Sequence, residues 1–215
     1  MTEEMMITRL LMTSLSLAMW GTVGTVSLAQ ADNIPIGSAT NAIGTLTIVR
    51  TDGVQQRLQG KGNVPLYEGD VLKTDGSSQA LISFAEGIEV ALNENTSFKL
   101  LSRWEKDKPT VRILRLKQGE VWAKTAGGPK RFEVETPVAT ASVKETEFNL
   151  KVQEDGQSIL TVIEGIVQFG TPFGTCPIRT ETISYGVRGK KCTKPAATDA
   201  KAARAWTDAL HGTGK

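Results

Sequence analysis

The sequence has almost none of the side chains on which metal, redox and nucleophilic chemistry depend. Its 215 residues include one histidine and two cysteines, too few for a cluster of His and Cys ligands with zinc-site spacing. The histidine, His211, lies near the C-terminus, where we expect exposed surface, and a Ser-His-Asp or Cys-His arrangement would have to recruit it from there. No glycine-rich phosphate loop opens a helix. The sequence therefore predicts a protein that is not an enzyme and uses neither a metal nor a cofactor.

Charge of one sign is also lacking. Lys and Arg number 25 against 23 Asp and Glu, a formal net charge of +2, which is too small and too scattered to predict nucleic-acid binding. Two carboxylate pairs, Glu133/Glu135 and Glu145/Glu147, have the spacing of one strand face and would be the only candidates for glycosidic hydrolysis. Solvated strand faces show the same spacing, so an envelope hydrolase is the least favoured hypothesis.

The N-terminal stretch predicts export. Residues 10–31 carry no charge and are rich in Leu, Met, Val and small residues, and they end in Ala29-Gln30-Ala31, the pattern of a signal-peptidase site. An uncleaved membrane anchor is the alternative, because the uncharged run is nominally long enough to cross a bilayer. We expect a signal peptide at 1–31 and a periplasmic or secreted mature chain, with membrane contact only if the leader is uncleaved.

Cys176 and Cys192 both lie in the part expected to be exported. An even count in an oxidising compartment favours a disulfide, which would contribute about 3 kcal/mol on the chain-entropy estimate. A metal site is the weaker alternative, because no Cys-x-x-Cys or His pairing accompanies the two cysteines.

Short segments of alternating apolar and polar residues, separated by turn signals, dominate the rest of the chain. Three copies of one phrase (apolar, any residue, Glu or Gln, Gly, any residue, apolar) contain Gly69, Gly119 and Gly165, and a divergent fourth contains Gly87. Glycine reaches positive φ without a Cβ clash, so each phrase predicts a tight reversal between strands. Asp75-Gly76 and Asp155-Gly156 predict hairpins. We expect an all-β fold, an irregular antiparallel sandwich or barrel of many short strands.

One helix is expected, at the C-terminus. Thr198 or Asp199 is suited to cap it, and Gly212 lies beyond its end. Its apolar face would carry Ala202, Ala203, Trp206 and Leu210. Docking of this face on the β-body is favoured over recognition of a partner.

Residues 66–169 resemble the FecR domain, named for the iron-dicitrate sensor FecR of bacterial cell-surface signalling. The matching stretches, each weak alone and specific in their order, are 72–80 (LKTDGSSQA), 86–92 (EGIEVAL), 116–122 (LKQGEVW), 132–139 (FEVETPVA), 146–148 (TEF) and 162–167 (VIEGIV). From this resemblance, together with the strand pattern on either side, we expect a FecR-type β-domain at 44–195, preceded by a leader at 32–43 and followed by a C-terminal helix and tail at 196–215.

Two departures from the family pattern bear on function. Glu145 stands where the family has Gly before its Thr-x-Phe element, which would cost on the order of 1 kcal/mol if that position has positive φ. FecR itself also has a cytoplasmic sigma-factor-binding segment, a membrane helix and a further C-terminal domain. We expect the β-module here without that transmembrane relay.

The candidate binding residues are Trp104, Arg103 and Lys106. They lie in the polar, charged stretch 102–108, where an indole has no evident place in a core and a structural role is weighed equally with binding. The favoured hypothesis is a non-catalytic binding or scaffolding module of the bacterial cell envelope, whose partner is an envelope protein or a cell-wall polysaccharide. The alternative is an accessory regulator in cell-surface (iron-linked) signal transduction.

Overall fold

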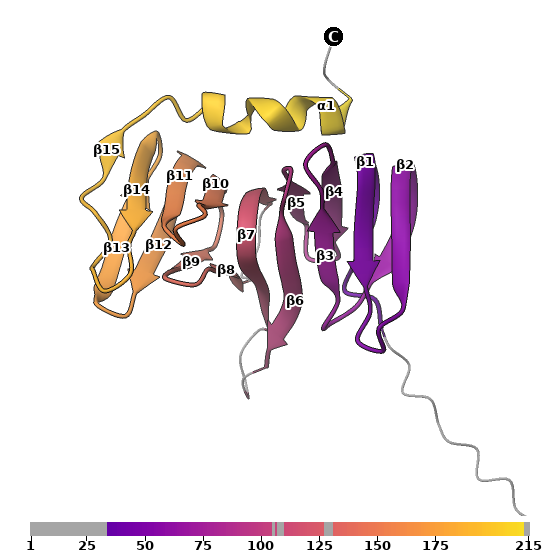
Figure 1. Cartoon of the computed structure of the whole chain (residues 1–215). Coiled ribbons are helices and arrows are strands. Elements are labelled where there is room, and N and C mark those ends of the chain that lie inside the picture. The colour runs from indigo at the N-terminus through magenta and orange to yellow at the C-terminus, as the bar shows by residue number, and fades with distance from the viewer. Residues whose placement is uncertain (1–33, 105, 107–109, 127–130, 213–215) are drawn as a thin grey trace, which may run out of the picture. The chain divides into compact units, whose positions relative to one another are not determined.

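The computed structural model describes residues 34–104, 106, 110–126 and 131–212, so the predicted signal peptide lies outside the described residues. Strands take up most of the described chain, and its helical residues are confined to the C-terminal end (Figure 1). The all-β prediction is therefore confirmed.

The first half of the fold is a small closed barrel. Its strands follow the order β7-β5-β4-β1-β3-β6, and β6 pairs again with β7 to close the ring. All of these pairs are antiparallel. The barrel strands are β1 (Gly37–Val49), β3 (Val71–Thr74), β4 (Gln79–Phe84), β5 (Ile88–Leu92), β6 (Ser97–Arg103) and β7 (Val111–Thr125).

The second half consists of two ribbons of strands that both start from β7. One ribbon contains β8 (Arg131–Glu135), β9 (Thr140–Val143), β12 (Ile166–Thr171) and β13 (Gly174–Arg179). The other contains β10 (Glu147–Val152), β11 (Ser158–Glu164), β14 (Thr182–Gly186) and β15 (Ala196–Ala197). Phe132 of one ribbon packs on Phe148 of the other, with ring centroids 6.4 Å apart. Their core is continuous with that of the barrel, so the halves form one hydrophobic body.

Two strand assignments in the N-terminal region were wrong or missed. Residues 37–43, expected in a leader, form the first part of β1. The strand β2 (Gln55–Leu66) was not predicted, because most of its residues are exposed and its sequence lacks apolar alternation. It forms because it lies along β1 on the outside of the barrel, and its Lys61 and Pro65 suit an exposed sheet edge.

The repeated glycine phrase makes corners rather than hairpins. Gly69, Gly119 and Gly165 have φ of 88°, 92° and 89°, as the phrase predicted. However, β2 does not pair with β3, nor β11 with β12, and Gly119 lies inside β7. Only the divergent fourth copy, at Gly87, closes a true hairpin, between β4 and β5. The phrase therefore moves the chain from one set of strand neighbours to the next.

The Asp75-Gly76 turn was also wrong as a hairpin, since β3 and β4 both pair with β1 and not with each other. Asp75 Oδ1 accepts hydrogen bonds from the Ser78 hydroxyl (2.6 Å) and the Ser77 amide (3.1 Å). Ser78 Oγ in turn accepts the Thr45 amide proton, which ties the turn to β1. The hydrogen bond from Ser78, followed by that from the Ser77 amide, lowers the pKa of Asp75 below its ordinary value of 3.8. The second turn prediction, Asp155-Gly156, is confirmed as the β10–β11 hairpin.

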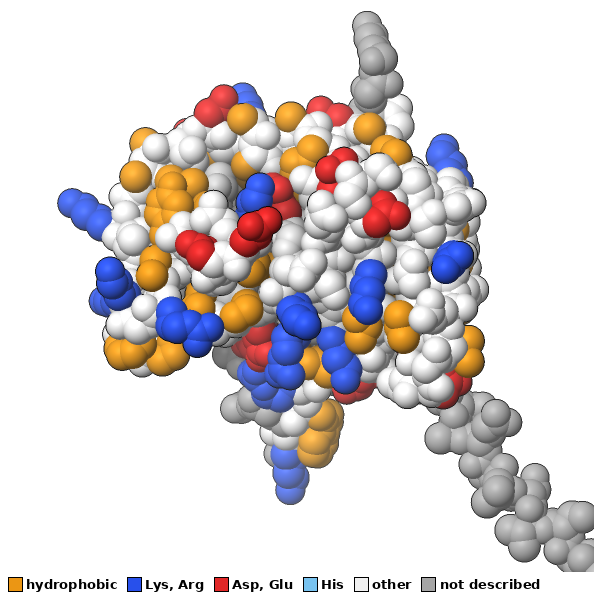
Figure 2. Space-filling model, viewed as in Figure 1, with side chains coloured by type: hydrophobic (Ala, Val, Ile, Leu, Met, Phe, Trp, Pro, Cys, Tyr) orange, Lys and Arg blue, Asp and Glu red, His pale blue; other side chains and the backbone are white. Residues whose placement is uncertain are grey.

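The long strand β7 contains a bulge. The bulge lies at Lys117, where Phe98 pairs with Leu116 but Ser97 pairs with Gln118. The bulge reverses the in–out alternation, because Leu116 and Val121, five positions apart, both lie in the core. Side chains of the N-terminal half of β7 therefore face a different part of the surface from those of the C-terminal half. Figure 2 shows Lys and Arg side chains gathered over the region of β6 and β7.

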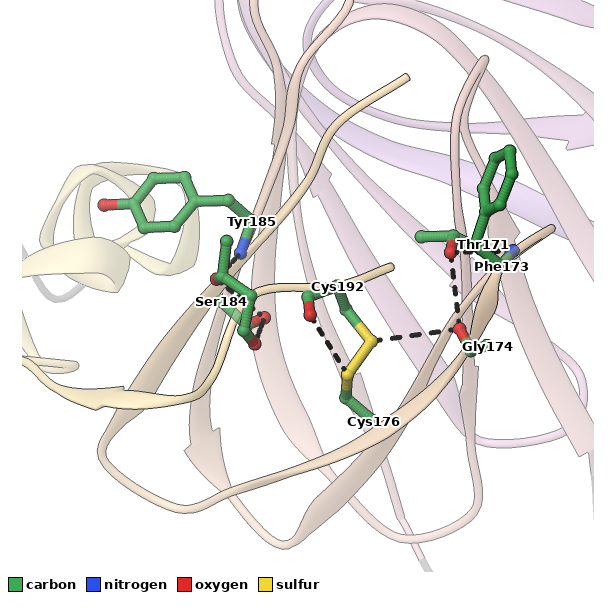
Figure 3. The surroundings of a disulfide bond; sticks show 8 residues. Thr171, Phe173, Gly174, Cys176, Ser184, Tyr185 and Cys192 are labelled. Carbon is green, nitrogen blue, oxygen red and sulfur yellow. Dashed lines mark hydrogen bonds between the residues drawn. A yellow bond between two sulfur atoms is a disulfide. The ribbon is translucent and has the colours of Figure 1, made fainter. Parts of the chain in front are cut away.

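The predicted disulfide is present. It joins Cys176 on β13 to Cys192 on the segment that returns after β14, with the two Cα atoms 6.2 Å apart (Figure 3). Both cysteines are buried in the core. The Thr193 side chain accepts the Tyr185 amide proton, so the returning segment is held by hydrogen bonds as well as by the disulfide.

The C-terminal segment crosses the β-body as predicted, but as two short helices, a 3-10 helix η1 (Ala202–Thr207) and α1 (Asp208–His211) (Figure 1). Asp199 Oδ1 accepts the Ala202 amide proton at 3.3 Å, and Gly212 ends α1 with φ 74°. Leu210 packs with Leu81, Ala91 and Trp122, whereas Ala202 is exposed, contrary to expectation. Among the described residues, no helix is long and apolar enough to span a bilayer.

Candidate functional site

Four outward side chains line up across neighbouring strands of the two halves. Val71 on β3 pairs with Lys99 on β6, Lys99 with Arg115 on β7, and Arg115 with Glu135 on β8. These residues are far apart in the sequence and are brought into one row only by strand pairing. We refer to the surface around this row as the β6–β7 face.

A groove of about 340 Å³ lies along the row. Its lining combines the apolar groups of Val71, Phe98, Leu116 and Pro137 with the polar residues of its rim, Ser97, Lys99, Arg115, Lys117, Glu135 and Thr136. The side chains of Phe98 and Leu116 are buried in the core and contribute almost no surface, so the apolar surface of the groove comes from half-buried Val71, exposed Pro137 and the aliphatic parts of the lysines. The groove therefore offers an apolar base with cations above it.

The charges of this face are not balanced. Arg115 pairs with Glu135 at 2.9 Å, but Lys99 and Lys117 have no acidic partner among the described residues. Lys99 also lies directly opposite Arg115, and like charges in that position destabilise a sheet. Lys99, Arg115 and Lys117 are exposed, and they provide positive charge that an anionic group would neutralise.

The residues predicted from the sequence lie at the far end of β6. Trp104 follows this strand and is 74% exposed, and Lys106 is exposed as well. Arg103 is held by Glu133 (3.1 Å) and Glu135 (3.6 Å), so Glu135 connects Arg103 with Arg115 in the groove. The structure thus links one of the three predicted residues to the groove by an ion pair.

Sequence reasoning missed the groove. The sequence did contain a signal. Lys99 and Arg103 are separated by four positions and Arg115 and Lys117 by two, and residues at even spacing lie on one face of a strand. What the sequence did not contain was the adjacency of β6 and β7, on which the combined positive charge depends.

Part of β7 beside the groove has a strand neighbour on one side only. The N-terminal part of β7 pairs with β8 through Arg115, and the C-terminal part pairs with β10 from Gly119 onward. Residues 116–118, between these two pairings, have β6 as their sole strand neighbour within the described chain. A second, polar groove of about 870 Å³ begins there and shares Lys117 with the first.

The carboxylate pairs are structural. Glu147 is buried, contrary to the expectation of a solvated strand face, and it accepts hydrogen bonds from Trp122 Nε1 (3.1 Å) and Arg204 (3.0 Å). Lys124 pairs with its second oxygen at 3.1 Å. These contacts fasten the C-terminal helices to β7 and β10. Glu133 and Glu135 are engaged by arginines, as described above.

The other residues singled out in the sequence also take part in packing. The His211 imidazole packs edge-on against Trp122, with ring centroids 5.4 Å apart, and its Nε2 lies 3.3 Å from Glu89. Glu145 does not have positive φ, so the strain considered for it is absent. In the parts of the chain that the structure describes, no group of three or more His, Cys, Asp or Glu residues is placed to hold a metal ion.

Comparisons with known proteins identify the domain. Residues 70–168 match the family model described as FecR protein. No curated protein matches the chain. Two crystal structures of a putative anti-sigma factor from Parabacteroides distasonis ATCC 8503 share the fold at 20% sequence identity, with TM-scores of 0.56 and 0.55. Each match covers 64% of this chain and 64% of that chain, so less than two thirds of the Parabacteroides protein is represented.

Proposed function

We propose that this chain, whose residues 70–168 are a FecR domain, is an exported, non-catalytic binding module that takes part in the regulation of cell-surface signalling. It would act by holding a partner protein rather than by chemical turnover. The regulatory role, ranked second on the sequence alone, becomes the leading one.

The observation that carries the proposal is the extent of the family match. The matched segment runs from the residue before β3 to the middle of β12, and includes every residue that lines the groove on the β6–β7 face. The surface best suited to a partner is therefore part of the FecR domain itself. The Parabacteroides structures support the fold, and the name that they carry agrees with a regulatory role.

The cysteine pair supports export, because a buried disulfide is typical of proteins that mature in an oxidising compartment. The carboxylates give no support to hydrolysis: Glu147, Glu133 and Glu135 each have a basic partner that accounts for their position. Polysaccharide binding at Trp104 remains the second candidate, favoured by the exposure of this indole beside a cationic strand end.

Deletion of the gene in the bacterium that produces the protein, followed by measurement of all transcripts, tests the regulatory role. We expect a defined set of genes to change, and the wild-type chain supplied in trans to restore them. Transcripts that stay the same after deletion, under conditions in which the protein is made, would contradict regulation. Retention of the purified chain on isolated cell wall, lost in Trp104→Ala, would instead support the second candidate.

A further inference from the structure

We infer that the groove on the β6–β7 face binds an extended protein segment in which acidic and apolar side chains alternate. This inference rests on the proposed function, because it names the chemistry of the partner that the FecR domain would hold. Three properties of the groove, taken in turn below, define that chemistry.

The floor selects apolar side chains. Val71 is half-buried and Pro137 is exposed at the groove, and these two side chains provide its accessible apolar groups. The aliphatic parts of Lys99 and Lys117 extend the same apolar surface. Covering this surface removes it from water, which favours a partner that inserts aliphatic groups.

The rim selects negative charge. Lys99, Arg115 and Lys117 surround the groove, and Glu135, its one acidic lining residue, is already shared by Arg115 and Arg103. The direct opposition of Lys99 and Arg115 is unfavourable in the free protein. Carboxylates of a bound segment would relieve this repulsion, so charge complementarity points to an acidic occupant.

The backbone selects an extended conformation. Residues 116–118 of β7 lack a strand neighbour on the groove side within the described chain, over a length of about 10 Å at 3.3 Å per residue. An added strand would use this gap for main-chain hydrogen bonds, and its alternating side chains would face the floor and the solvent-side rim in turn. The bulge at Lys117 directs this lysine to the junction of the two grooves.

A polysaccharide fits the groove less well. Sugars are usually held by exposed aromatic faces, and the one aromatic ring in the lining, Phe98, is 1% exposed. Trp104 lies beyond the end of β6 and is not part of the lining. The groove and the Trp104 region are therefore separable by experiment.

The test measures binding of a labelled peptide of about ten residues, alternating Glu and Val, to the purified full-length chain by fluorescence anisotropy. The comparison peptides carry Lys in place of Glu, or N-methylated amides at alternate positions. The groove variant is Lys99→Glu with Lys117→Glu. The control is Lys61→Glu with Lys144→Glu, which changes the net charge by the same amount at two exposed positions outside the lining.

We expect the Glu/Val peptide to bind, and its affinity to fall at least about tenfold in the groove variant and by less than about twofold in the control. Raising the salt from about 0.05 to 0.3 M should weaken binding. The Lys/Val and N-methylated peptides should bind at least about tenfold less well, because one lacks the charge and the other the main-chain donors.

No binding of the Glu/Val peptide, or equal loss in the groove and control variants, would overturn the inference. Binding of an anionic polysaccharide such as polygalacturonate, without binding of the peptide, would overturn it in favour of a glycan site. Neither result would affect the proposed function, which fails separately if gene deletion leaves the transcripts unchanged.

Discussion

The two halves of β7 present their outer faces to different surroundings. In the C-terminal half, Trp122 points outward and is covered by the protein's own C-terminal helices, together with Leu81 and Ala91. In the N-terminal half, Arg115 and Lys117 point outward, and no described element covers the groove beside them. One strand thus contributes both to a closed internal contact and to an open, basic surface.

The difference between the halves shows what the covering segment requires. The helices are held by groups that match them: Asn41 Nδ2 donates to the Leu210 carbonyl (2.8 Å), Asn149 Nδ2 donates to the Ala203 carbonyl (3.0 Å), and Glu147 pairs with Arg204. The groove beside the N-terminal half also has apolar lining residues, but Lys99 and Lys117 at its rim have no acidic partner among the described residues. It is suited to a segment of opposite charge that this part of the chain does not supply.

The largest loss of stability is expected when the contact between the C-terminal half of β7 and the helices is removed. Trp122→Ala should lower the free energy of unfolding by about 3–5 kcal/mol, since the indole is buried and its removal leaves a cavity beneath Leu210. Urea denaturation measures this change. Trp104→Ala is the control, with an expected effect within about 0.5 kcal/mol because that indole is exposed. Equal losses in both variants would contradict the comparison.

Removing the carboxylate beneath the helices should have the next largest effect. Glu147→Ala is expected to cost about 1–3 kcal/mol, because it leaves Trp122 Nε1 buried without its acceptor and removes the partner of Arg204. Amide hydrogen exchange should rise first in residues 202–211. Glu147→Gln, which keeps an acceptor, should lose less. Unchanged exchange in that segment would show that Glu147 does not hold the helices.

Acid should weaken the barrel turn at Asp75. Because its folded-state pKa is lowered, the stability that the carboxylate contributes is fully present above its ordinary value of 3.8 and is lost as the pH falls through the folded-state pKa. Asp75→Asn should therefore be less stable than the wild type near pH 6, and the difference should shrink below about pH 4. Denaturation at a series of pH values measures it; a difference independent of pH would contradict this role.

The smallest change in stability is expected at the uncovered N-terminal half of β7, where the substitution should stabilise the protein. Lys99→Glu replaces repulsion across from Arg115 by attraction, and should stabilise the fold by about 0.2–1 kcal/mol at low salt. Lys61→Glu, on the edge strand β2, should leave stability nearly unchanged. A gain in stability together with loss of peptide binding would show that the basic row is kept for function. A loss of stability would remove that argument.

Much of the local structure was predictable, and the errors share one cause. The positive φ of Gly69, Gly119 and Gly165 follows from residue type and local sequence. The tight reversals between strands predicted at these glycines do not join strands that pair with each other, because a tight turn does not specify which strand lies opposite. Similarly, β2 was missed because a polar edge strand depends on β1 for its existence.

The candidate site was predicted only at its margin. Arg103 stays connected to the groove through Glu135, but Val71, Lys99 and Lys117 were not recognised. Each is an ordinary outward strand residue in the sequence, and the groove exists only where β3, β6, β7 and the β8–β9 connection meet. The helix contacts were foreseen better, because the spacing of Trp206 and Leu210 already marks one helical face.

By itself, the amino-acid order determined the β-rich composition, the glycine positions with left-handed backbone, the cysteine pair and the docking helix, since each depends on residue type or short-range spacing. The tertiary structure alone decided the closure of the barrel, the bulge that reverses β7 and the row from Val71 to Glu135. The reason is that segments far apart in the sequence compete to pair with the same strand edges. Which pairing forms depends on the packing of the whole core.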